Sequence, residues 1–315
     1  MPETVRAALA ARKAAHQYKT SDPPAEPFLE ELQAMSHLIL QSPALRAENV
    51  EQIAALANAQ GVHSLGNTAA HLLGVDQNER AEIGRLCDTL GIDYALLDSI
   101  RSLSDCKILA MDMDSTLINI ECIDEIADMV GRKAQVAAIT EAAMRGEIAD
   151  FAESLRRRVA LLEGVPASEL ERVYTERLRL NAGAERLIET AHAAGLQTLL
   201  VSGGFTLFTQ RLKERLNLHE THANVLEVEN GMLTGKVLGP IVDGQAKADH
   251  VAALAQRLGA TADQIIALGD GANDLKMLAL AGYSVAYRAK PVVREQTRFA
   301  INFSGLDAVL NWFKA

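Results

Sequence analysis

The hydrophobic pattern of the chain becomes regular near residue 103. From there, short apolar runs alternate with longer stretches of helical periodicity. Four of the apolar runs predict buried strands, at residues 108–111, 198–201, 265–268 and 284–286. Strands that alternate with amphipathic helices are typical of a parallel, doubly wound sheet. The pattern therefore predicts an α/β domain with a Rossmann-like parallel sheet over residues 103–315.

The interval between the first two strands is longer than the dozen or so residues that a crossover needs. Helical periodicity fills it at residues 122–130, 133–145, 150–162 and 167–180. These segments predict a helical cap, about residues 122–180, inserted after the first core strand. Further on, residues 224–243 predict a hairpin with Asn230-Gly231 at its turn.

The part before residue 103 has a different pattern. Apolar runs at 37–40, 68–75 and 94–97 alternate with helical stretches at 47–59 and 77–91, which predicts a small α+β domain over residues 28–102. Three prolines within residues 21–27 separate it from an N-terminal segment and linker, residues 1–27.

Composition narrows the class of protein. A chain of 315 residues has room for two or three domains. Its net charge of −10, without a basic block, argues against nucleic acid or an anionic membrane as the main partner. No apolar run approaches the ~18 residues of a membrane span. The three widely spaced cysteines, Cys87, Cys106 and Cys122, favour reduced thiols and a cytoplasmic location over a disulfide framework or a zinc site.

The chemistry starts where the first core strand ends, at Asp112 and Asp114. Two carboxylates this close repel each other unless a cation or a shared proton compensates them. An alternative is a helix start with Asp114 or Ser115 as N-cap. An EF-hand calcium loop is rejected, because Leu117 stands where the turn needs glycine and Ile123 where the bidentate Glu belongs.

Polar residues also follow two later strands, at Ser202-Gly203-Gly204 and at Asp270. The carboxyl ends of parallel strands share one edge, so we expect Asp112, Ser202 and Asp270 to converge there. Carboxylates of Asp112 and Asp270 would suit one Mg²⁺ ion. A hydroxyl, a lysine and backbone N–H groups would suit phosphate oxygens.

Two basic residues are ambiguous when each is taken alone. Lys247 opens a predicted helix, where a single lysine is normally solvated. Arg158 lies on the apolar stripe of the third cap helix with Phe151, Leu155 and Leu162, which suggests an anion within the cap. An arginine that reaches from the edge of the stripe to water is the other option.

These motifs resemble those of a known superfamily. Asp112-Met-Asp114-Ser115-Thr116, Ser202-Gly-Gly-Phe205, Lys247 and Gly269-Asp270-Gly-Ala-Asn273-Asp274 together resemble the four motifs of the haloacid dehalogenase superfamily. Within it, Glu121-Cys-Ile-Asp-Glu125 and the segment 151–159 resemble the phosphoserine phosphatases. The resemblance covers about residues 105–303. The small domain before it, residues 28–102, is similar in arrangement to the regulatory-type domains, ACT-like or ferredoxin-like, that precede the phosphatase in some members, which implies a regulatory role for it.

The resemblance implies hydrolysis of O-phospho-L-serine, the last step of serine biosynthesis, through an aspartyl-phosphate on Asp112, with Asp114 as general acid and base. One Mg²⁺ would be held by Asp112, Asp270 and the backbone carbonyl of Asp114. The implied phosphate ligands and their supporting residues are Ser202, Gly203, Gly204, Lys247, Asn273 and Asp274. Glu121 and Arg158 would recognise the amino and carboxylate groups of the substrate, beneath an apolar lid of Met144 and Phe151.

Alternatives remain open. A phosphotransferase, or a phosphatase for another small phosphoester, would use the same motifs. A protein of another class, an amino-acid sensor, would place its function in residues 28–102. The expected partner is a small phosphomonoester, and a homodimer through the N-terminal domain is an option.

Overall fold

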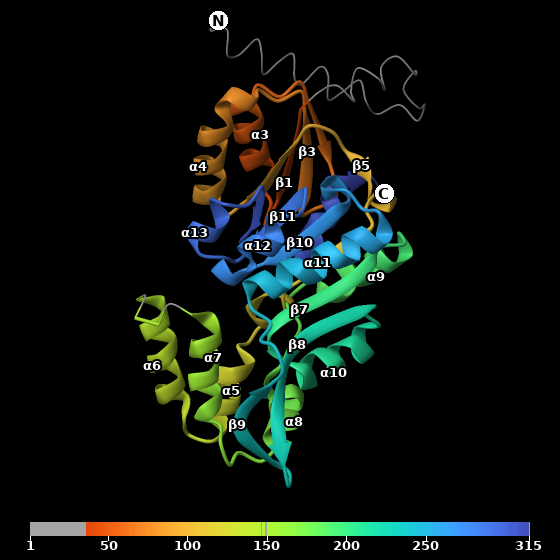
Figure 1. Cartoon of the computed structure of the whole chain (residues 1–315). Helices are drawn as coiled ribbons and strands as arrows, with labels where there is room; N and C mark the ends of the chain where they lie inside the picture. Colours follow the sequence, from red (N-terminus) through yellow and green to blue (C-terminus); the bar gives the residue numbers. More distant parts are fainter. Residues whose placement is uncertain (1–35, 146, 149, 315) are drawn as a thin grey trace, which may run out of the picture. The chain divides into compact units, whose positions relative to one another are not determined.

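The computed structural model (Figure 1) describes residues 36–145, 147–148 and 150–314. These residues form two compact units. The larger unit comprises residues 106–298, and the smaller one combines residues 36–105 with 299–314. The predicted N-terminal segment, residues 1–27, lies outside the described residues. Residues 299–314, which we predicted as part of the larger domain, thus group with the smaller unit.

The smaller unit is built on a four-stranded antiparallel sheet with the strand order β2-β3-β1-β4. Its elements are β1 (His37–Gln41), α3 (Ala47–Leu56), β2 (Gly61–Ser64), β3 (Ala69–Leu73), η1 (Gln77–Glu79), α4 (Arg80–Leu90) and β4 (Asp93–Leu97). This is the split β-α-β-β-α-β, ferredoxin-like arrangement. The α+β prediction is confirmed, although β2 was missed, because this edge strand is too exposed to show an apolar pattern.

Alternation of apolar residues along β1 and β3 places one set of side chains in the core of the smaller unit. Leu38, Leu40 and Leu72 pack there against Ile53 of α3 and Ile83 of α4. The chain then continues through β5 (Arg101–Ser102) and η2 (Leu103–Asp105).

A buried carboxylate anchors the end of the chain in the smaller unit. Asp93 accepts hydrogen bonds from the backbone N–H groups of Asn302, Phe303 and Ser304, at 2.6 to 3.3 Å. The segment consists of β12 (Phe299–Ile301), η7 (Leu306–Trp312) and β13 (Phe313–Lys314), and β13 pairs with β5. Because a buried carboxylate is costly unless it is hydrogen-bonded, these bonds tie residues 302–304 to β4.

The larger unit contains the predicted parallel sheet. Its strands are β6 (Ile108–Met111), β7 (Gln197–Phe205), β8 (Glu220–Glu229), β9 (Met232–Leu238), β10 (Ile265–Gly269) and β11 (Tyr283–Tyr287), in the order β11-β10-β6-β7-β8-β9. All pairs are parallel except β8–β9. Every residue of β6 and β10 is buried, as expected for central strands covered on both faces. All four predicted strands are confirmed.

Helices connect these strands. They are α9 (Ala184–Ala193), α10 (Thr206–Leu216), α11 (Gly244–Leu258), η5 (Ala262–Gln264), η6 (Ala272–Asp274), α12 (Leu275–Leu278) and α13 (Pro291–Arg294). The predicted hairpin is β8–β9, and its turn residues Asn230 and Gly231 have φ of 51° and 79°. Two left-handed residues define the turn that matches the twist of a hairpin, which explains the Asn-Gly pair.

The predicted cap insertion is present between β6 and β7. It contains α5 (Cys122–Met129), α6 (Lys133–Met144), α7 (Phe151–Ala160), α8 (Ser168–Arg172) and a further turn, η4 (Val173–Arg177). A bridge between Ile118 and Leu180 closes its base. The hairpin reaches this region, where β9 packs against α7 (Figure 1).

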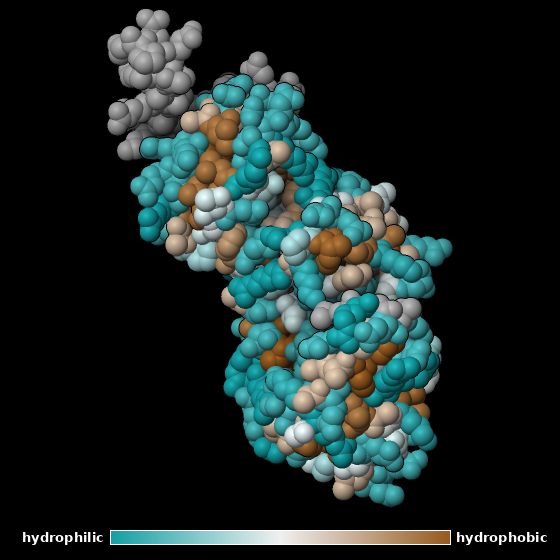
Figure 2. All heavy atoms as spheres, turned by 90° about the vertical axis from the view of Figure 1, so that its left-hand side faces the viewer, coloured by the Kyte–Doolittle hydropathy of each residue, from teal (hydrophilic) through white to brown (hydrophobic). Residues whose placement is uncertain are grey.

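The face drawn in Figure 2 is mainly hydrophilic, with apolar side chains in separate patches. Val225, Val228, Met232 and Leu238 on the β8–β9 hairpin are among the exposed large apolar side chains. Within the described part of the chain, no helix is both long enough and apolar enough to cross a membrane.

Candidate active site

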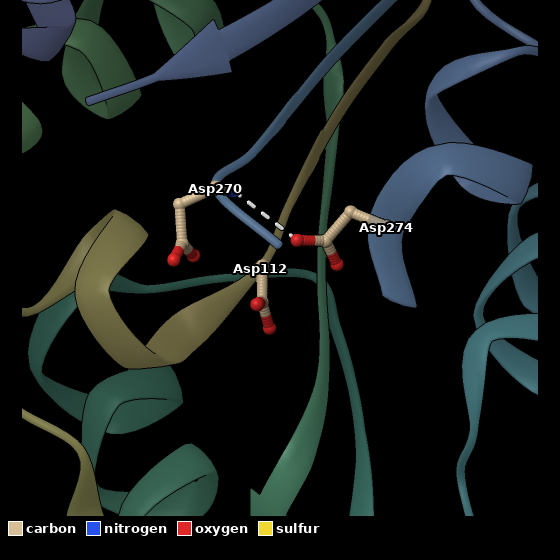
Figure 3. A group of neighbouring side chains, drawn as sticks. All are labelled: Asp112, Asp270 and Asp274. Carbon is tan, nitrogen blue, oxygen red and sulfur yellow. Dashed lines mark hydrogen bonds between the residues drawn. The ribbon is translucent and has the colours of Figure 1, made fainter. Parts of the chain in front are cut away.

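Three aspartates meet at the carboxyl edge of the sheet (Figure 3). Asp112 follows β6, Asp270 follows β10, and Asp274 ends η6. The parallel register pairs Met111 with Leu268, so the two strands end at the same level. One oxygen of each carboxylate lies within 4.8 Å of the others. The expected convergence of Asp112 and Asp270 is therefore present.

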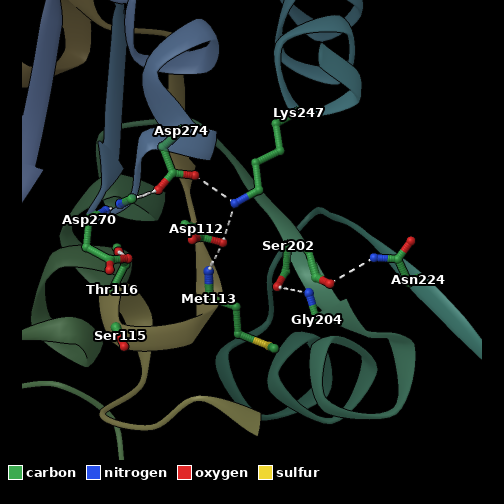
Figure 4. Close-up of polar contacts among 12 residues, drawn as sticks. Asp112, Met113, Ser115, Thr116, Ser202, Gly204, Asn224, Lys247, Asp270 and Asp274 are labelled. Atoms are coloured by element: carbon green, nitrogen blue, oxygen red, sulfur yellow. Dashed lines mark hydrogen bonds and ion pairs between the residues drawn. The ribbon is translucent and has the colours of Figure 1, made fainter. Parts of the chain in front are cut away.

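Lys247 of α11 provides positive charge at this cluster. Its Nζ lies 2.7 Å from Asp112 Oδ1 and 2.7 Å from Asp274 Oδ1, and the side chain is 1% exposed (Figure 4). Burial alone would lower the pKa of Lys247, but the charges of Asp112 and Asp274 outweigh it and raise the pKa. Lys247 is therefore not solvated, although a lysine at the start of a helix usually is.

One lysine does not balance three carboxylates. Burial, reinforced by the charge of Asp274, raises the pKa of Asp112 well above its ordinary range, against the opposing effect of Lys247. Burial and Asp274 likewise raise the pKa of Asp270 to about 7. Raised carboxyl pKa values indicate that the site lacks positive charge, which a proton or a bound cation would supply.

The hydrogen bonds show which of the three aspartates have a carboxylate oxygen free to bind a metal ion. Asp274 uses both oxygens: Oδ1 accepts from Lys247, and Oδ2 accepts from the backbone N–H groups of Asp270 and Gly271 at 3.1 and 3.0 Å. Asp270 engages Oδ1, which accepts from the Thr116 hydroxyl at 2.9 Å. Asp112 engages Oδ1, which accepts from the Met113 N–H at 2.7 Å. Asp112 and Asp270 therefore each have one carboxylate oxygen available to bind a cation. Two protein carboxylates suit Mg²⁺, which usually takes its other ligands from water and substrate.

Asp114 lies in the tight turn η3 (Met113–Leu117) that follows β6. Burial and then the charge of Glu121 raise the pKa of Asp114 to about 8, although Cys122 donates to its carboxyl group. Among the described residues, its Oδ1 is buried and has no hydrogen-bond partner. A carboxyl group that is protonated near neutral pH and has an unused oxygen suits a general acid.

The conformation of this turn excludes the alternative that Asp114 or Ser115 is the N-cap residue of a helix. Ser115 adopts a left-handed conformation with φ of 56°, and the next α-helix, α5, begins at Cys122. The Ser115 hydroxyl donates to Glu121 Oε1 at 2.6 Å. This strained turn therefore sets the orientation of Asp114, and its Ser115 hydroxyl holds the carboxylate of Glu121 in place.

The end of β7 is irregular at Ser202, Gly203 and Gly204, because the pairing with β8 shifts register between Val201 and Phe205. The N–H of Gly204 donates to Ser202 Oγ at 2.9 Å. A Cβ on Gly204 would lie 2.8 Å from Met113 Cε, and a Cβ on Gly203 would lie 3.0 Å from Phe151 Cζ. The glycines thus allow η3 and the cap residue Phe151 to approach the end of β7.

Asn273 is held by close backbone packing. A Cβ on Gly271 would lie 2.1 Å from Asn273 Oδ1, and a Cβ on Gly244 would lie 2.7 Å from the Asn273 carbonyl oxygen. Both glycines are therefore required for the position of Asn273, half-buried beside the aspartate cluster.

The cap places Arg158 in an acidic environment. The side chain is half-buried, and burial lowers its pKa, against the charges of Asp124, Glu121 and Asp114, which raise it. Leu155 and Leu162 of the same stripe are buried. Met144 ends α6, and its side chain is not among the parts of the chain that the structure describes.

Sequence reasoning did not predict the contacts of three groups at the site. Thr116 belongs to the first motif, but its contact with Asp270 links residues that are far apart in the sequence. The thiol of Cys122 lies against Asp114. Asn224 is buried and donates from Nδ2 to the carbonyl oxygen of Gly203, and an asparagine inside a predicted hairpin gave no signal of this.

Comparisons with known proteins agree with the geometry. A model of the haloacid dehalogenase-like hydrolases matches residues 109–279, and a domain of unknown function (DUF4072) matches residues 38–83. Phosphoserine phosphatase of Polaromonas sp. is 57% identical over 216 residues, which cover 67% of this chain and 92% of that protein. The corresponding enzyme of Vibrio cholerae is 43% identical over 236 residues, 75% of this chain and 71% of that protein.

Solved structures are similar as well. A probable phosphoserine phosphatase from Vibrio cholerae, in unliganded form, has a TM-score of 0.77 at 37% identity, covering 89% of this chain and 86% of that one. A substrate-bound phosphoserine phosphatase complex has a TM-score of 0.62 at 37% identity, covering 66% of this chain and 99% of that one. The chain belongs to the haloacid dehalogenase-like hydrolase family.

Proposed function

We propose that this protein is a Mg²⁺-dependent phosphatase that hydrolyses O-phospho-L-serine to L-serine and phosphate. The observation that carries the proposal is the pair Asp112 and Asp114. One carboxylate is paired with a buried lysine, and the other is a buried acid whose pKa is raised to about 8. A nucleophile beside a protonated acid suits displacement of an alkoxide that must leave as an alcohol. The curated relatives that act on phosphoserine support the choice of substrate.

In the first step, an oxygen of Asp112 attacks phosphorus, and the bond from phosphorus to the serine oxygen breaks. Asp114 gives its proton to that oxygen, so that serine leaves and an aspartyl-phosphate remains on Asp112. In the second step, Asp114 takes a proton from a water that attacks the same phosphorus. The bond from phosphorus to the Asp112 oxygen breaks, phosphate leaves, and both carboxyl groups return to their starting states.

Phosphate would be held by donors from three elements. Ser202 and the N–H of Gly203 come from β7, Lys247 comes from α11, and Asn273 comes from η6, with Gly204 and Asp274 in support. Asp112, Asp270 and the backbone carbonyl of Asp114 would hold Mg²⁺, which neutralises charge on the phosphoryl oxygens when it is bound.

Substrate selection would come from the cap. Glu121 carries negative charge suited to an ammonium group, and the guanidinium of Arg158 suits a carboxylate. Phe151 already lies against Gly203, as an apolar lid with Met144 would require. We also propose a cytoplasmic location, supported by three buried cysteines that form no disulfide. A homodimer and a regulatory role for the smaller unit remain predictions.

The decisive experiment is phosphate release from L-phosphoserine, phosphothreonine and p-nitrophenyl phosphate, each with Mg²⁺ and with a chelator. We expect strong preference for phosphoserine and loss of activity with the chelator. Arg158→Ala should raise KM for phosphoserine about 10-fold or more but leave KM for p-nitrophenyl phosphate nearly unchanged. Arg156→Ala, on the exposed side of α7, is the matched control. Equal effects of Arg158→Ala on both substrates would remove it from substrate recognition.

A further inference from the structure

Asn224 joins two backbone segments of the site, the end of β7 and the residues before α11. It lies on β8 where the pairing with β7 shifts register between Val201 and Phe205, and it is 1% exposed. Its Nδ2 donates to the carbonyl oxygen of Gly203 at 2.8 Å (Figure 4). Its Oδ1 accepts from the N–H of Val242, also at 2.8 Å. One carboxamide is therefore fully oriented between two backbone segments.

The first bond acts on Ser202 through a single peptide unit. The carbonyl of Gly203 and the N–H of Gly204 belong to the same planar group. Asn224 holds the carbonyl side, and the N–H side donates to Ser202 Oγ at 2.9 Å. A hydroxyl oxygen that already accepts this bond keeps its own proton to donate elsewhere. Asn224 thereby fixes the plane that orients the Ser202 hydroxyl.

The second bond acts on the start of α11. Val242 precedes Asp243, the N-cap residue, whose Oδ1 accepts from the N–H groups of Gln245 and Ala246, both at 2.9 Å. Lys247 lies in the first turn of this helix, with its Nζ on Asp112 and Asp274. Asn224 thus also ties down the segment that delivers Lys247.

We propose that Asn224 is a positioning residue that holds residues 202–204 of β7 and the start of α11 at the spacing that one phosphoryl group requires. It would act through the Gly203–Gly204 peptide and through Val242, without touching substrate. This inference rests on the proposed phosphatase function. Ser202 and Lys247 would contact one phosphoryl group from two sides, so a small displacement of either donor would weaken binding of the phosphoryl group and slow its transfer.

Two variants separate positioning from general stability. Asn224→Asp keeps the size of the side chain and the acceptor for Val242, but it sets a carboxylate oxygen against the Gly203 carbonyl. Asn224→Ala removes both bonds without adding charge. Thr234→Val is the control, because it removes a hydrogen bond of 2.6 Å to Glu227 elsewhere in the β8–β9 hairpin.

The measurements are kcat and KM for phosphoserine, Ki for inorganic phosphate with Mg²⁺, and the midpoint of thermal unfolding. We expect both Asn224 variants to raise KM and Ki about 10-fold or more, and Thr234→Val to leave both near the wild-type values. Relative to wild type, the defect of Asn224→Asp should shrink from pH 8 to pH 5.5, because a protonated carboxyl regains a donor. The defect of Asn224→Ala should not depend on pH.

Folded Asn224 variants with unchanged KM and Ki would overturn the inference. So would a defect in Asn224→Asp alone, because it would trace to added charge rather than to a lost donor. If Asn224→Ala does not fold, the pH dependence of Asn224→Asp decides. Absence of phosphatase activity in the wild-type protein would instead refute the proposed function, and Ki would then be replaced by the directly measured affinity for inorganic phosphate.

Discussion

Replacing Lys247 by methionine tests whether a buried cation holds the aspartate cluster together. Methionine fills a similar volume but carries no charge. Each of the two ion pairs at 2.7 Å contributes a gross attraction of about 6 kcal/mol at an effective dielectric constant of about 20. Desolvation of the three groups offsets most of this, at several kcal/mol per ion. Removal of one partner from a buried network typically lowers the free energy of unfolding by about 3–5 kcal/mol, which we expect here.

The loss should depend on pH. Without Lys247, Asp112 faces Asp274 in the interior with no cation between them, and the folded variant should bind about one proton more than folded wild type at neutral pH. Relative to wild type, such a variant loses about 1.4 kcal/mol of stability for each unit by which pH rises, until that proton is released. Its deficit relative to wild type should therefore widen between pH 6 and pH 8, and added Mg²⁺ should reduce it.

The assay is urea unfolding, followed by circular dichroism and by the fluorescence of Trp312. Trp312 is the single tryptophan and belongs to the smaller unit, so its signal distinguishes the two units. Lys276→Met, which removes an exposed hydrogen bond to Gln245, serves as the control. A loss below about 1 kcal/mol that does not change with pH would show that Lys247 does not compensate the carboxylates.

Three further predictions concern single sites. Asp112→Asn should lower kcat for phosphoserine by about 10³-fold or more while the protein stays folded by circular dichroism, and retention of full activity would refute its role as nucleophile. Gly271→Ala should displace Asn273, since the new Cβ would meet Oδ1 at 2.1 Å, and lower kcat/KM about 10-fold or more, whereas Gly61→Ala, with its nearest contact at 3.4 Å, should have no such effect. Burial, His37 and His63 lower the pKa of His71 to about 4, so stability contributed by neutral His71 is complete above pH 6.5 and is lost as pH falls toward 4. His71→Asn should reduce the change in the free energy of unfolding between pH 7 and pH 4.5 by about 1–2 kcal/mol, a value that allows for solvent screening. Unfolding followed by Trp312 fluorescence over this pH range measures the change. Identical pH profiles of variant and wild type would contradict the reasoning.

Local patterns in the sequence predicted the elements that depend on near neighbours. Uniform apolar character predicted β6 and β10, because central strands are covered on both faces. The Asn230-Gly231 pair predicted the hairpin turn, since its φ requirement is a property of two residues alone. The edge strand β2 was missed because its side chains are largely exposed.

Contacts between distant segments could not be predicted in this way. The grouping of residues 299–314 with the smaller unit depends on bonds to Asp93, about 200 residues earlier. The sequence suggested a role for Lys247 only within an ordered set of motifs, because a lone lysine is usually solvated.

The sequence by itself determined the kind of chemistry. Asp112 and Asp114 end an apolar strand, where charges have no structural use, and parallel topology brings Asp270 to the same edge. Only the tertiary structure decided how these groups are tuned. Burial raises the pKa of Asp114 to about 8, and the orientation of Asn224 depends on backbone groups of Gly203 and Val242, which lie on either side of it in the sequence. Burial and hydrogen-bond direction result from packing between segments, and no local pattern of residues specifies them.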